Sequence, residues 1–258
     1  MAVIDSKETT RRWLEAFVAG FSETRSLTHP YNAAEIYPSI WLLSDAPRRS
    51  GPYRKSEYIA FGHMPEVVMR AIRASGSSRI NLCIMSADQA GARIEKERYK
   101  QLGFRYLGAE PLFVADLGAY TPPSPCFDIR RVTTRSDADR IRTAARGRQI
   151  SAANLASSTP KVRLYSAFAG DTPLGWVRSV TTHGDRAWVS NLFVRSESRG
   201  QGIGRSLITC MQQDDVRHGI RYSVLLASSA GARLYPHVGY VERGVLTMFT
   251  GHLTTVDG

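Results

Sequence analysis

The feature that most constrains this chain is a strand-like run that leads through a glycine-rich loop into a helix. Residues 187–194 are apolar, β-branched and aromatic, a polar loop then carries Gly200, Gly202 and Gly204, and apolar residues follow at helical spacing. Glycines at such a turn let the backbone approach a ligand closely, and the unpaired N–H groups of the first helical turn favour an anion. The stretch therefore predicts a phosphate-binding loop, with a flexible turn as the alternative.

Two better-known phosphate loops are excluded by the glycine spacing. The dinucleotide fingerprint requires a third glycine three residues after the second, whereas Gly204 follows Gly202 by two. The nucleoside-triphosphate loop requires Gly-Lys-Ser/Thr, which the loop lacks. Arg199 and Arg205 flank the glycines, and their guanidinium groups suit a diphosphate better than a neutral ligand.

The loop and the strand before it resemble a known cofactor site. Leu192-Phe193-Val194 followed by Arg199-x-x-Gly202-x-Gly204 resembles the acyl-CoA-binding motif of the GNAT acetyltransferase superfamily, Arg/Gln-x-x-Gly-x-Gly/Ala at the start of a helix. The resemblance implies that the strand splays from its neighbour at a bulge, where backbone N–H groups of residues 192–194 bind the acetyl carbonyl and pantetheine, Leu192 being the oxyanion donor. It also implies a set of loop residues that hold the diphosphate: Arg199, Gly200, Gln201, Gly202, Ile203, Gly204 and Arg205.

A second stretch resembles another signature of the same superfamily. Ser228-x-x-Gly231-x-x-Leu234-Tyr235-x-x-x-Gly239-Tyr240 is similar to Asn-x-x-Ala-x-x-Leu-Tyr-x-x-x-Gly-Phe. The resemblance implies that Tyr235 is the general acid that protonates the CoA thiolate, and a phenol with an ordinary pKa of about 10 is protonated at neutral pH. A tyrosine that only packs in the core is the alternative. Ser228 replaces the usual asparagine beside pantetheine, and Pro236 predicts that the helix stops near Leu234.

No general base is evident from the sequence. Histone-type members of the superfamily carry a glutamate four residues before the oxyanion donor, and Trp188 occupies that position. The sequence therefore argues against a histone-type lysine acetyltransferase, and we expect deprotonation through water or an amine that arrives neutral. The acceptor pocket is expected near residues 146–157 and the first half of the chain, where Trp176, Trp188 and Arg148-Gln149 are either lining or core residues.

The chain divides at a proline-rich segment. Prolines at 122, 123 and 125 cannot continue a helix or a central strand. The sequence predicts a degenerate GNAT-like domain over 1–120, a linker over 121–126 and a complete GNAT domain over 127–258. Tyr99-x-x-x-Gly103-Phe104 matches Tyr235-x-x-x-Gly239-Tyr240, which indicates a degenerate internal repeat. Because residues 61–64 offer no glycine-rich loop, only the second half is expected to bind acyl-CoA.

The predicted fold class is α/β, or mixed α+β, with two units, each a mostly antiparallel mixed sheet flanked by helices. Helices are expected over 5–27, 65–74, 89–102, 137–148, 203–218 and from 230 onward. Strands are expected over 37–44, 56–61, 80–86, 105–107, 112–117, 162–169, 174–182, 187–194, 222–227 and 240–250. A tight hairpin turn is expected over 183–186.

Composition limits the other functions. The 258 residues carry a formal net charge of +11, yet no basic run or recognition-helix signature accompanies it, so an anionic cofactor or an acidic acceptor is favoured over nucleic acid. No apolar run of about 18 residues and no signal-peptide pattern occurs, which predicts a cytoplasmic protein without membrane association. The three cysteines, Cys83, Cys126 and Cys210, lack metal-ligand spacing, and no metal is expected.

Together these features predict an acyltransferase, namely an acetyl-CoA-dependent N-acetyltransferase that acts directly on a small-molecule amine. Two alternatives remain open, a non-catalytic acyl-CoA-binding or regulatory module and a protein N-acetyltransferase. Since the tandem arrangement imitates a dimer within one chain, either a monomer or a homodimer is compatible with it.

Overall fold

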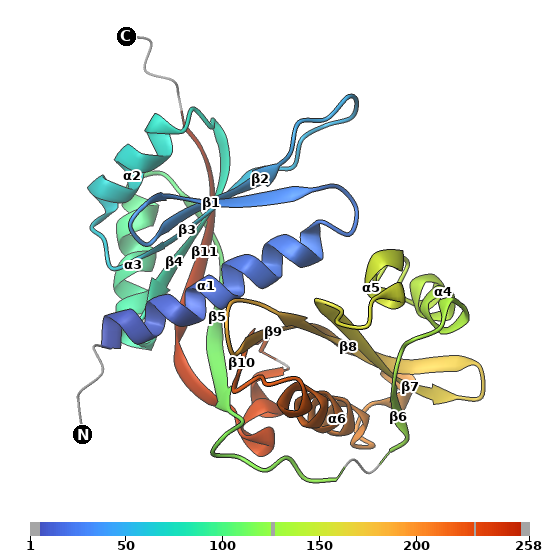
Figure 1. Ribbon diagram of the computed structural model, residues 1–258. Coiled ribbons are helices and arrows are strands. Elements are labelled where there is room, and N and C mark those ends of the chain that lie inside the picture. Colours follow the sequence, from blue (N-terminus) through green and yellow to red (C-terminus); the bar gives the residue numbers. More distant parts are fainter. Residues whose placement is uncertain (1–5, 125–126, 230, 254–258) are drawn as a thin grey trace.

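The protein forms one mixed β-sheet with helices on both faces (Figure 1). The computed structural model describes residues 6–124, 127–229 and 231–253, and the part it describes contains an eleven-stranded sheet in the order β1-β2-β3-β4-β11-β5-β10-β9-β8-β7-β6. This mixed α/β architecture is the predicted fold class. The sequence did not indicate that the strands of both halves join in a single sheet.

The first half contains α1 Ser6–Arg25, β1 Tyr31–Tyr37, β2 Ile40–Asp45, β3 Ser56–Phe61, α2 Pro65–Ala74, β4 Arg79–Ser86, α3 Gln89–Gln101 and β5 Arg105–Asp116. The second contains β6 Ile129–Arg131, α4 Arg135–Ala144, α5 Ala152–Ala156, β7 Val162–Ala169, β8 Thr172–Thr181, β9 Arg186–Val194, the 3₁₀ turn η1 Ser196–Ser198, α6 Ile203–Arg217, β10 Tyr222–Leu226, the 3₁₀ turns η2 Gly231–Arg233 and η3 Tyr235–Val238, and β11 Val241–His252.

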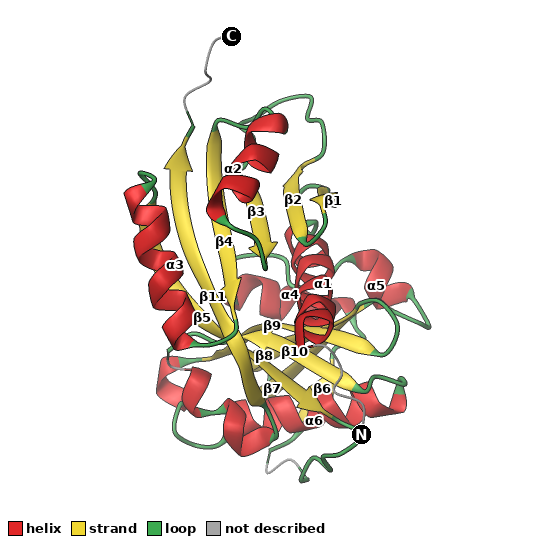
Figure 2. Cartoon of the chain, turned by 90° about the vertical axis from the view of Figure 1, so that its left-hand side faces the viewer, coloured by secondary structure: helices red, strands yellow, loops and turns green. Residues whose placement is uncertain are grey.

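The two halves exchange their last strands. β11, the final strand of the second half, pairs antiparallel with β4 and β5, and β5 in turn pairs antiparallel with β10. Each half therefore inserts its last strand next to the other half's penultimate strand. Figure 2 shows β5 and β11 as two long strands that run side by side between the halves. The exchange ties both halves into one sheet although residues 121–126 separate them in sequence.

The internal repeat is visible in the topology. β3, α2 and β4 form a parallel crossover unit, as do β9, α6 and β10. Tyr99 and Tyr235 accept the same backbone hydrogen bond, from the N–H of Phe104 at 3.0 Å and of Tyr240 at 3.1 Å. Gly103 and Gly239 adopt left-handed φ angles of 86° and 84°, which a residue with a Cβ rarely adopts. The repeat thus reaches the level of single backbone hydrogen bonds.

Several element bounds differ from expectation. Residues 31–37 form β1, which the sequence did not suggest because Tyr-Asn-Ala-Ala-Glu-Ile-Tyr shows no regular alternation of apolar and polar residues. The expected pieces at 105–107 and 112–117 are one strand, β5, since Pro111 is accommodated within it. The expected helix over 137–148 ends at Ala144, and Arg146 takes a left-handed φ of 52°. The segment from 230 onward forms two 3₁₀ turns, because Pro236 interrupts helical hydrogen bonding.

Two layers of helices cover the sheet. α6 packs on one face of the second half with Phe113, Val177 and Leu225, while α1 packs on the opposite face with Val114 and Val224. α1 also contacts Trp41 and Ile59 of the first half, so this helix bridges both halves (Figure 1). α2 and α3 enclose a third cluster over β3, β4 and β11. Among the described residues, no helix is long and apolar enough to cross a membrane.

The predicted linker leads from β5 to β6. Its final residues, Pro125 and Cys126, lie outside the described part of the chain, as do Asp5 and Ala230, where two of the expected helices begin. The carbonyl of Pro123 accepts a hydrogen bond from Gln213 Nε2 at 3.1 Å, so the segment is attached to α6. Cys83 and Cys210 are free thiols. The boundaries 1–120 and 127–258 stay a prediction, since β5 and β11 belong to both halves of the sheet.

Candidate active site

Strand β9 leaves its parallel neighbour before it reaches the glycine loop. Its pairing with β10 ends at Trp188 and Val224, while β10 continues to pair with β5 as far as Leu226. On its other side β9 pairs with β8, where Ser190 lies opposite Arg178 and Phe193 lies opposite Trp176. Two residues of β9 but only one of β8 lie between these pairs, so β9 carries one extra residue. Asn191 takes a left-handed φ of 53° at this bulge. The splay begins after Trp188, and the bulge lies between Ser190 and Phe193, so the bulge includes Leu192, where the resemblance implied one.

The glycine loop turns the chain into α6. Gly200 and Gly202 have φ angles of 75° and 89°, and Gly202 is the N-cap of α6 without a side-chain capping bond. The first intrahelical bond starts at Ser206, whose N–H donates to the Gly202 carbonyl at 3.0 Å. The N–H groups of residues 203–205 therefore lack intrahelical acceptors and carry the positive end of the helix dipole. This arrangement suits a phosphate group.

A cavity of about 550 Å³ joins the loop to the end of β9. Most of the predicted cofactor residues line it: Leu192, Phe193, Val194, Arg199, Gly200, Gly202, Ile203, Gly204, Arg205 and Ser228. Ser198, Gly231 and Leu234 also line it and were not predicted. A Cβ at Gly204 would lie 3.5 Å from Leu234 Cδ2 and 3.6 Å from Val194 Cγ2, which are ordinary packing distances, so packing within the protein does not by itself require glycine there.

Three loop residues differ in how they are held. Arg199 donates from Nε to the Val194 carbonyl at 3.0 Å, which ties the loop to the end of β9. Arg205 is exposed and forms no ion pair with the described residues, so its guanidinium is available to an anion. Gln201 is exposed and does not line the cavity; its Nε2 lies 3.4 Å from the Glu197 carbonyl. Its predicted role in binding has the weakest geometric support.

Tyr235 lies at the inner end of the same cavity. Its ring is buried between Phe113 and Tyr240, at centroid distances of 5.9 Å and 5.5 Å. Burial raises the pKa of Tyr235 to about 12, and the negative charge of Glu110 adds to the effect. The phenol is therefore protonated at neutral pH, as a general acid must be. Tyr235 packs in the core and also lines the cavity, and its role as a general acid stays a prediction.

The residues expected to line the acceptor pocket do not lie together in one cavity. Arg148 and Gln149 line a cavity of about 570 Å³ beside α4 and α5. Gln149 accepts a hydrogen bond from Asn191 Nδ2 at 2.6 Å, so it supports the bulge of β9. Trp176 is buried and stacks on Phe193 at 4.6 Å between centroids. Trp188 lines a further cavity between the two halves.

That further cavity contains a carboxylate that the sequence pattern did not reveal. Glu110 lies on β5 of the first half, one residue before Pro111, whose carbonyl accepts a hydrogen bond from Ala227 just beyond β10. The strand exchange thus brings Glu110 beside the splay, near enough to Tyr235 for its charge to raise the phenol's pKa. A glutamate followed by proline inside a strand pattern was the available signal, and it indicated only a break between two strands. No group of His, Cys, Asp and Glu suited to a metal occurs among the described residues.

A family model covers the segment that holds this site. Residues 160–242 match the model described as acetyltransferase (GNAT) domain, and these residues include β9, the glycine loop and Tyr235. No curated protein sequence matches the chain.

Solved structures match nearly the whole chain in fold. The GCN5-related N-acetyltransferase from Kribbella flavida matches with a TM-score of 0.60 at 14% identity, over 94% of this chain and 97% of that one. A tandem GNAT protein from the clavulanic acid biosynthesis pathway matches with a TM-score of 0.53 at 14% identity, over 98% and 97%. The GCN5-related N-acetyltransferase from Sphaerobacter thermophilus matches with a TM-score of 0.55 at 16% identity, over 85% and 82%. At this identity the likeness concerns the fold.

Proposed function

We propose that the protein is an acetyl-CoA-dependent N-acetyltransferase that acts directly on the amine of a small molecule, because residues 160–242 match the acetyltransferase (GNAT) domain model. The observation that carries this proposal is the 550 Å³ cavity in which the strand bulge, the glycine loop and Tyr235 meet. Each of these parts has one step of the reaction to perform.

The glycine loop and α6 bind the CoA diphosphate. The N–H groups of residues 203–205 lack intrahelical acceptors, and Arg199 and Arg205 line the same cavity with positive charge. Pantetheine then lies between the splayed ends of β9 and β10, beside Ser228. In this position it directs the thioester toward the bulge at Leu192.

The bulge and Tyr235 act on the thioester. The Leu192 N–H donates to the acetyl carbonyl oxygen as negative charge develops there, which is the role of an oxyanion donor. Tyr235 donates its proton to the CoA sulfur as the carbon–sulfur bond breaks. Its raised pKa makes the phenolate strongly basic, so solvent returns the proton rapidly after each turnover.

The proposal is tested by two measurements on the full chain. Titration calorimetry with acetyl-CoA should give saturable one-site binding that CoA competes with. Thiol release from acetyl-CoA should then depend on an added amine from a panel of small amines and peptides. Binding without turnover on any acceptor would favour a non-catalytic acyl-CoA-binding module, turnover on peptides alone would favour a protein N-acetyltransferase, and absence of binding would overturn the cofactor assignment.

A further inference from the structure

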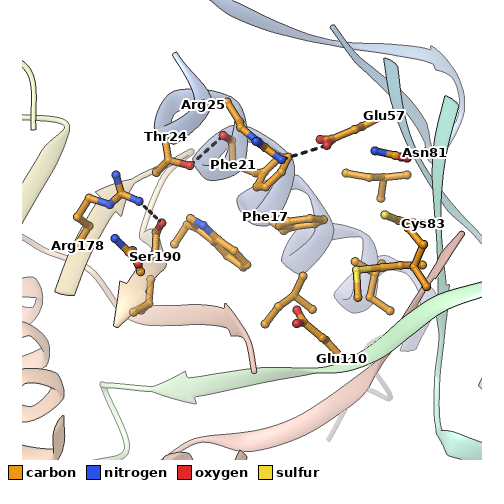
Figure 3. A pocket seen from close by; sticks show the side chains of 18 of the residues that line it. Phe17, Phe21, Thr24, Arg25, Glu57, Asn81, Cys83, Glu110, Arg178 and Ser190 are labelled. Atoms are coloured by element: carbon orange, nitrogen blue, oxygen red, sulfur yellow. Dashed lines mark hydrogen bonds and ion pairs between the residues drawn. The ribbon is translucent and has the colours of Figure 1, made fainter. Parts of the chain in front are cut away.

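A second cavity, of about 520 Å³, lies between the two halves of the chain. Helix α1 and strands β3 and β4 supply one side of it, and β8 and β9 supply the other. Figure 3 shows Arg178 and Ser190 facing Glu57 and Cys83 across the cavity, with Phe17 on α1 between them. Its volume is that of a small-molecule site.

The two cavities adjoin at the bulge of β9. Ser190 and Asn191 line the inter-half cavity, and the next residue, Leu192, lines the glycine-loop cavity. Glu110 also lines the inter-half cavity, while its charge reaches Tyr235 on the other side. A molecule bound between the halves therefore lies beside the place where the acetyl group is expected.

Arg178 is a buried cation without a counter-charge. Its side chain is 8% exposed, one terminal nitrogen donates to Ser190 Oγ at 3.0 Å, and Nε has no hydrogen-bond partner. No described carboxylate lies within ion-pair distance of it, and burial lowers its pKa to about 10, so it stays charged at neutral pH. Arg163 provides the contrast, since this equally buried guanidinium pairs with Asp215 at 2.5 Å. An unpaired buried cation that faces a cavity calls for an anion from outside the protein.

Glu110 is a half-buried anion without a partner. No hydrogen bond or ion pair joins it to the described residues, and burial raises its pKa. The other carboxylate of the cavity, Glu57, pairs with Arg25 at 3.2 Å. A dashed line marks this ion pair in Figure 3. Since Glu110 is both unpaired and next to the splay, it is the carboxylate placed to receive a proton from an attacking amine.

Most of the remaining lining residues are apolar, while Thr24 and Asn81 are polar and uncharged. Phe17 and Phe21 of α1 and Trp188 of β9 provide aromatic surface, with Leu226 and Met248 beside them. Cys83 also lines the cavity, but burial raises its pKa to about 12, so its thiol is not a nucleophile at neutral pH. The cavity thus offers one free cation, one free carboxylate and an apolar surface among the described residues.

We propose that the inter-half cavity is the acceptor site, and that its acceptor is a small amine that also carries a carboxylate, as an amino acid does. Arg178 binds the carboxylate through its guanidinium group, and Glu110 is the general base. This proposal rests on the proposed acetyl-CoA-dependent activity, and it assigns the base to the first half of the chain.

The chemical step balances with these residues. The ammonium group gives one proton to Glu110, which passes it to water, and the neutral nitrogen forms a bond to the acetyl carbon. The carbon–sulfur bond breaks, and the thiolate takes the proton of Tyr235. The second proton of the ammonium group leaves the nitrogen as the amide forms and reaches Tyr235 through solvent, which restores both residues.

The first test varies the acceptor and leaves the protein intact. Thiol release is measured with acetyl-CoA and a panel of α-, β- and γ-amino acids, each beside its carboxamide and its decarboxylated amine. At least one amino acid should react with a kcat/KM about tenfold or more above that of both counterparts, as expected for loss of a charge-assisted hydrogen bond. Equal or better turnover of the counterparts, or acetyl-CoA binding without turnover of any amino acid, would overturn the assignment.

The second test varies the two residues. Arg178→Gln and Arg178→Lys should raise KM for the preferred amino acid about tenfold or more and remove the discrimination against its carboxamide, while kcat changes little. Glu110→Gln should lower kcat at least about tenfold with acetyl-CoA affinity unchanged. The exposed residues Arg243 and Glu242 of β11 give matched controls, Arg243→Gln and Glu242→Gln, with unchanged kinetics.

The outcomes separate this proposal from the proposed function. Calorimetry with acetyl-CoA and thermal unfolding are measured on every variant, so a folded variant is distinguished from a damaged one. If acetyl-CoA binds and amines that lack a carboxylate are acetylated as well as amino acids are, the acceptor assignment fails and the acetyltransferase activity stands. If acetyl-CoA does not bind to the unaltered protein, the proposed function fails first. Unchanged kinetics in both Glu110→Gln and Arg178→Gln would also refute the acceptor assignment.

Discussion

Tyr99 and Tyr235 occupy the same place in the two halves, and each accepts a backbone hydrogen bond from the residue five positions later, at 3.0 Å and 3.1 Å. Their hydroxyl groups differ in environment. The Tyr99 hydroxyl is buried without a partner in the described structure, whereas Tyr235 lines the cavity beside the glycine loop. The repeat therefore provides its own internal control for the role of a tyrosine.

We expect Tyr235→Phe to lower kcat by about a hundredfold, because the thiolate then leaves without a proton donor. The affinity for acetyl-CoA should change little, since the ring and its packing remain. Steady-state kinetics of thiol release and calorimetry measure the two quantities. The matched Tyr99→Phe variant should keep full activity, and an equal loss in both variants would show that only packing is affected.

Gly202→Glu should abolish acetyl-CoA binding. The residue has a φ of 89°, and a glutamate there places both a Cβ and a negative charge at the predicted diphosphate site. Gly170 has a φ of 57° in the β7–β8 turn, and a Cβ added there would meet no atom within 4 Å. Gly170→Glu should therefore cost similar backbone strain and leave calorimetric binding intact. If Gly202→Glu still bound acetyl-CoA, the glycine loop would not be the site that binds the diphosphate.

Glu110→Gln should make the folded state more stable at neutral pH. Burial raises the pKa of Glu110, so wild-type stability is greatest below the ordinary pKa of a glutamate and falls as pH rises through the raised value. Glutamine carries no charge, so the variant does not lose stability as pH rises. Its gain in the free energy of unfolding over the wild type should vanish below about pH 4, where Glu110 is protonated in both the folded and the unfolded state. Urea unfolding of both proteins across pH measures the difference. An identical pH dependence would show that Glu110 is not desolvated.

The same shift sets the pH dependence of the rate. As the base, Glu110 must be ionised, so kcat should fall as pH drops through its raised pKa. The charged and titratable groups around it are Glu57, Cys83, Arg25 and Arg178 in the cavity and Tyr235 beyond the splay. Glu110→Gln should remove this acidic limb, whereas Glu57→Gln should leave it in place. A limb that persists in Glu110→Gln would assign it to another group.

Asp215→Asn should destabilise the protein by about 3–5 kcal/mol, because it leaves the buried Arg163 without its close counter-charge. Asp215 is fully buried and also accepts a hydrogen bond from Ser179 Oγ at 2.7 Å. Asp139→Asn is the control, since its ion pairs with Arg135 and Arg142 are largely exposed and should contribute less than about 1 kcal/mol. Urea denaturation midpoints measure both. If both variants lost less than about 1 kcal/mol, the buried pair of Arg163 and Asp215 would contribute no more to the free energy of unfolding than an exposed pair.

Local patterns predicted most elements of the fold. Residues 56–61 and 65–74 form a strand and a helix as expected, since both show strong periodicity and clear breaks. The strand at 31–37 has no such signal, because it lies at the sheet edge and most of its residues are exposed. The two 3₁₀ turns over 231–238 replace the expected helix because of Pro236, and the sequence already indicated that the helix would stop near Leu234.

The sequence by itself determined the glycine loop and the strand before it, because both follow local backbone rules, and the resemblance of residues 228–240 to a family signature implied the tyrosine that meets them. Only the tertiary structure decided which residues from distant parts of the chain lie beside this site. The exchange of β5 and β11 brings Glu110 to the splay beside β10, far from Leu192 along the chain. Likewise, Arg178 faces α1 across the inter-half cavity only because the halves share one sheet. Strand pairing between distant segments depends on the burial of both sheet faces, and this is a property of the whole chain that no local pattern contains.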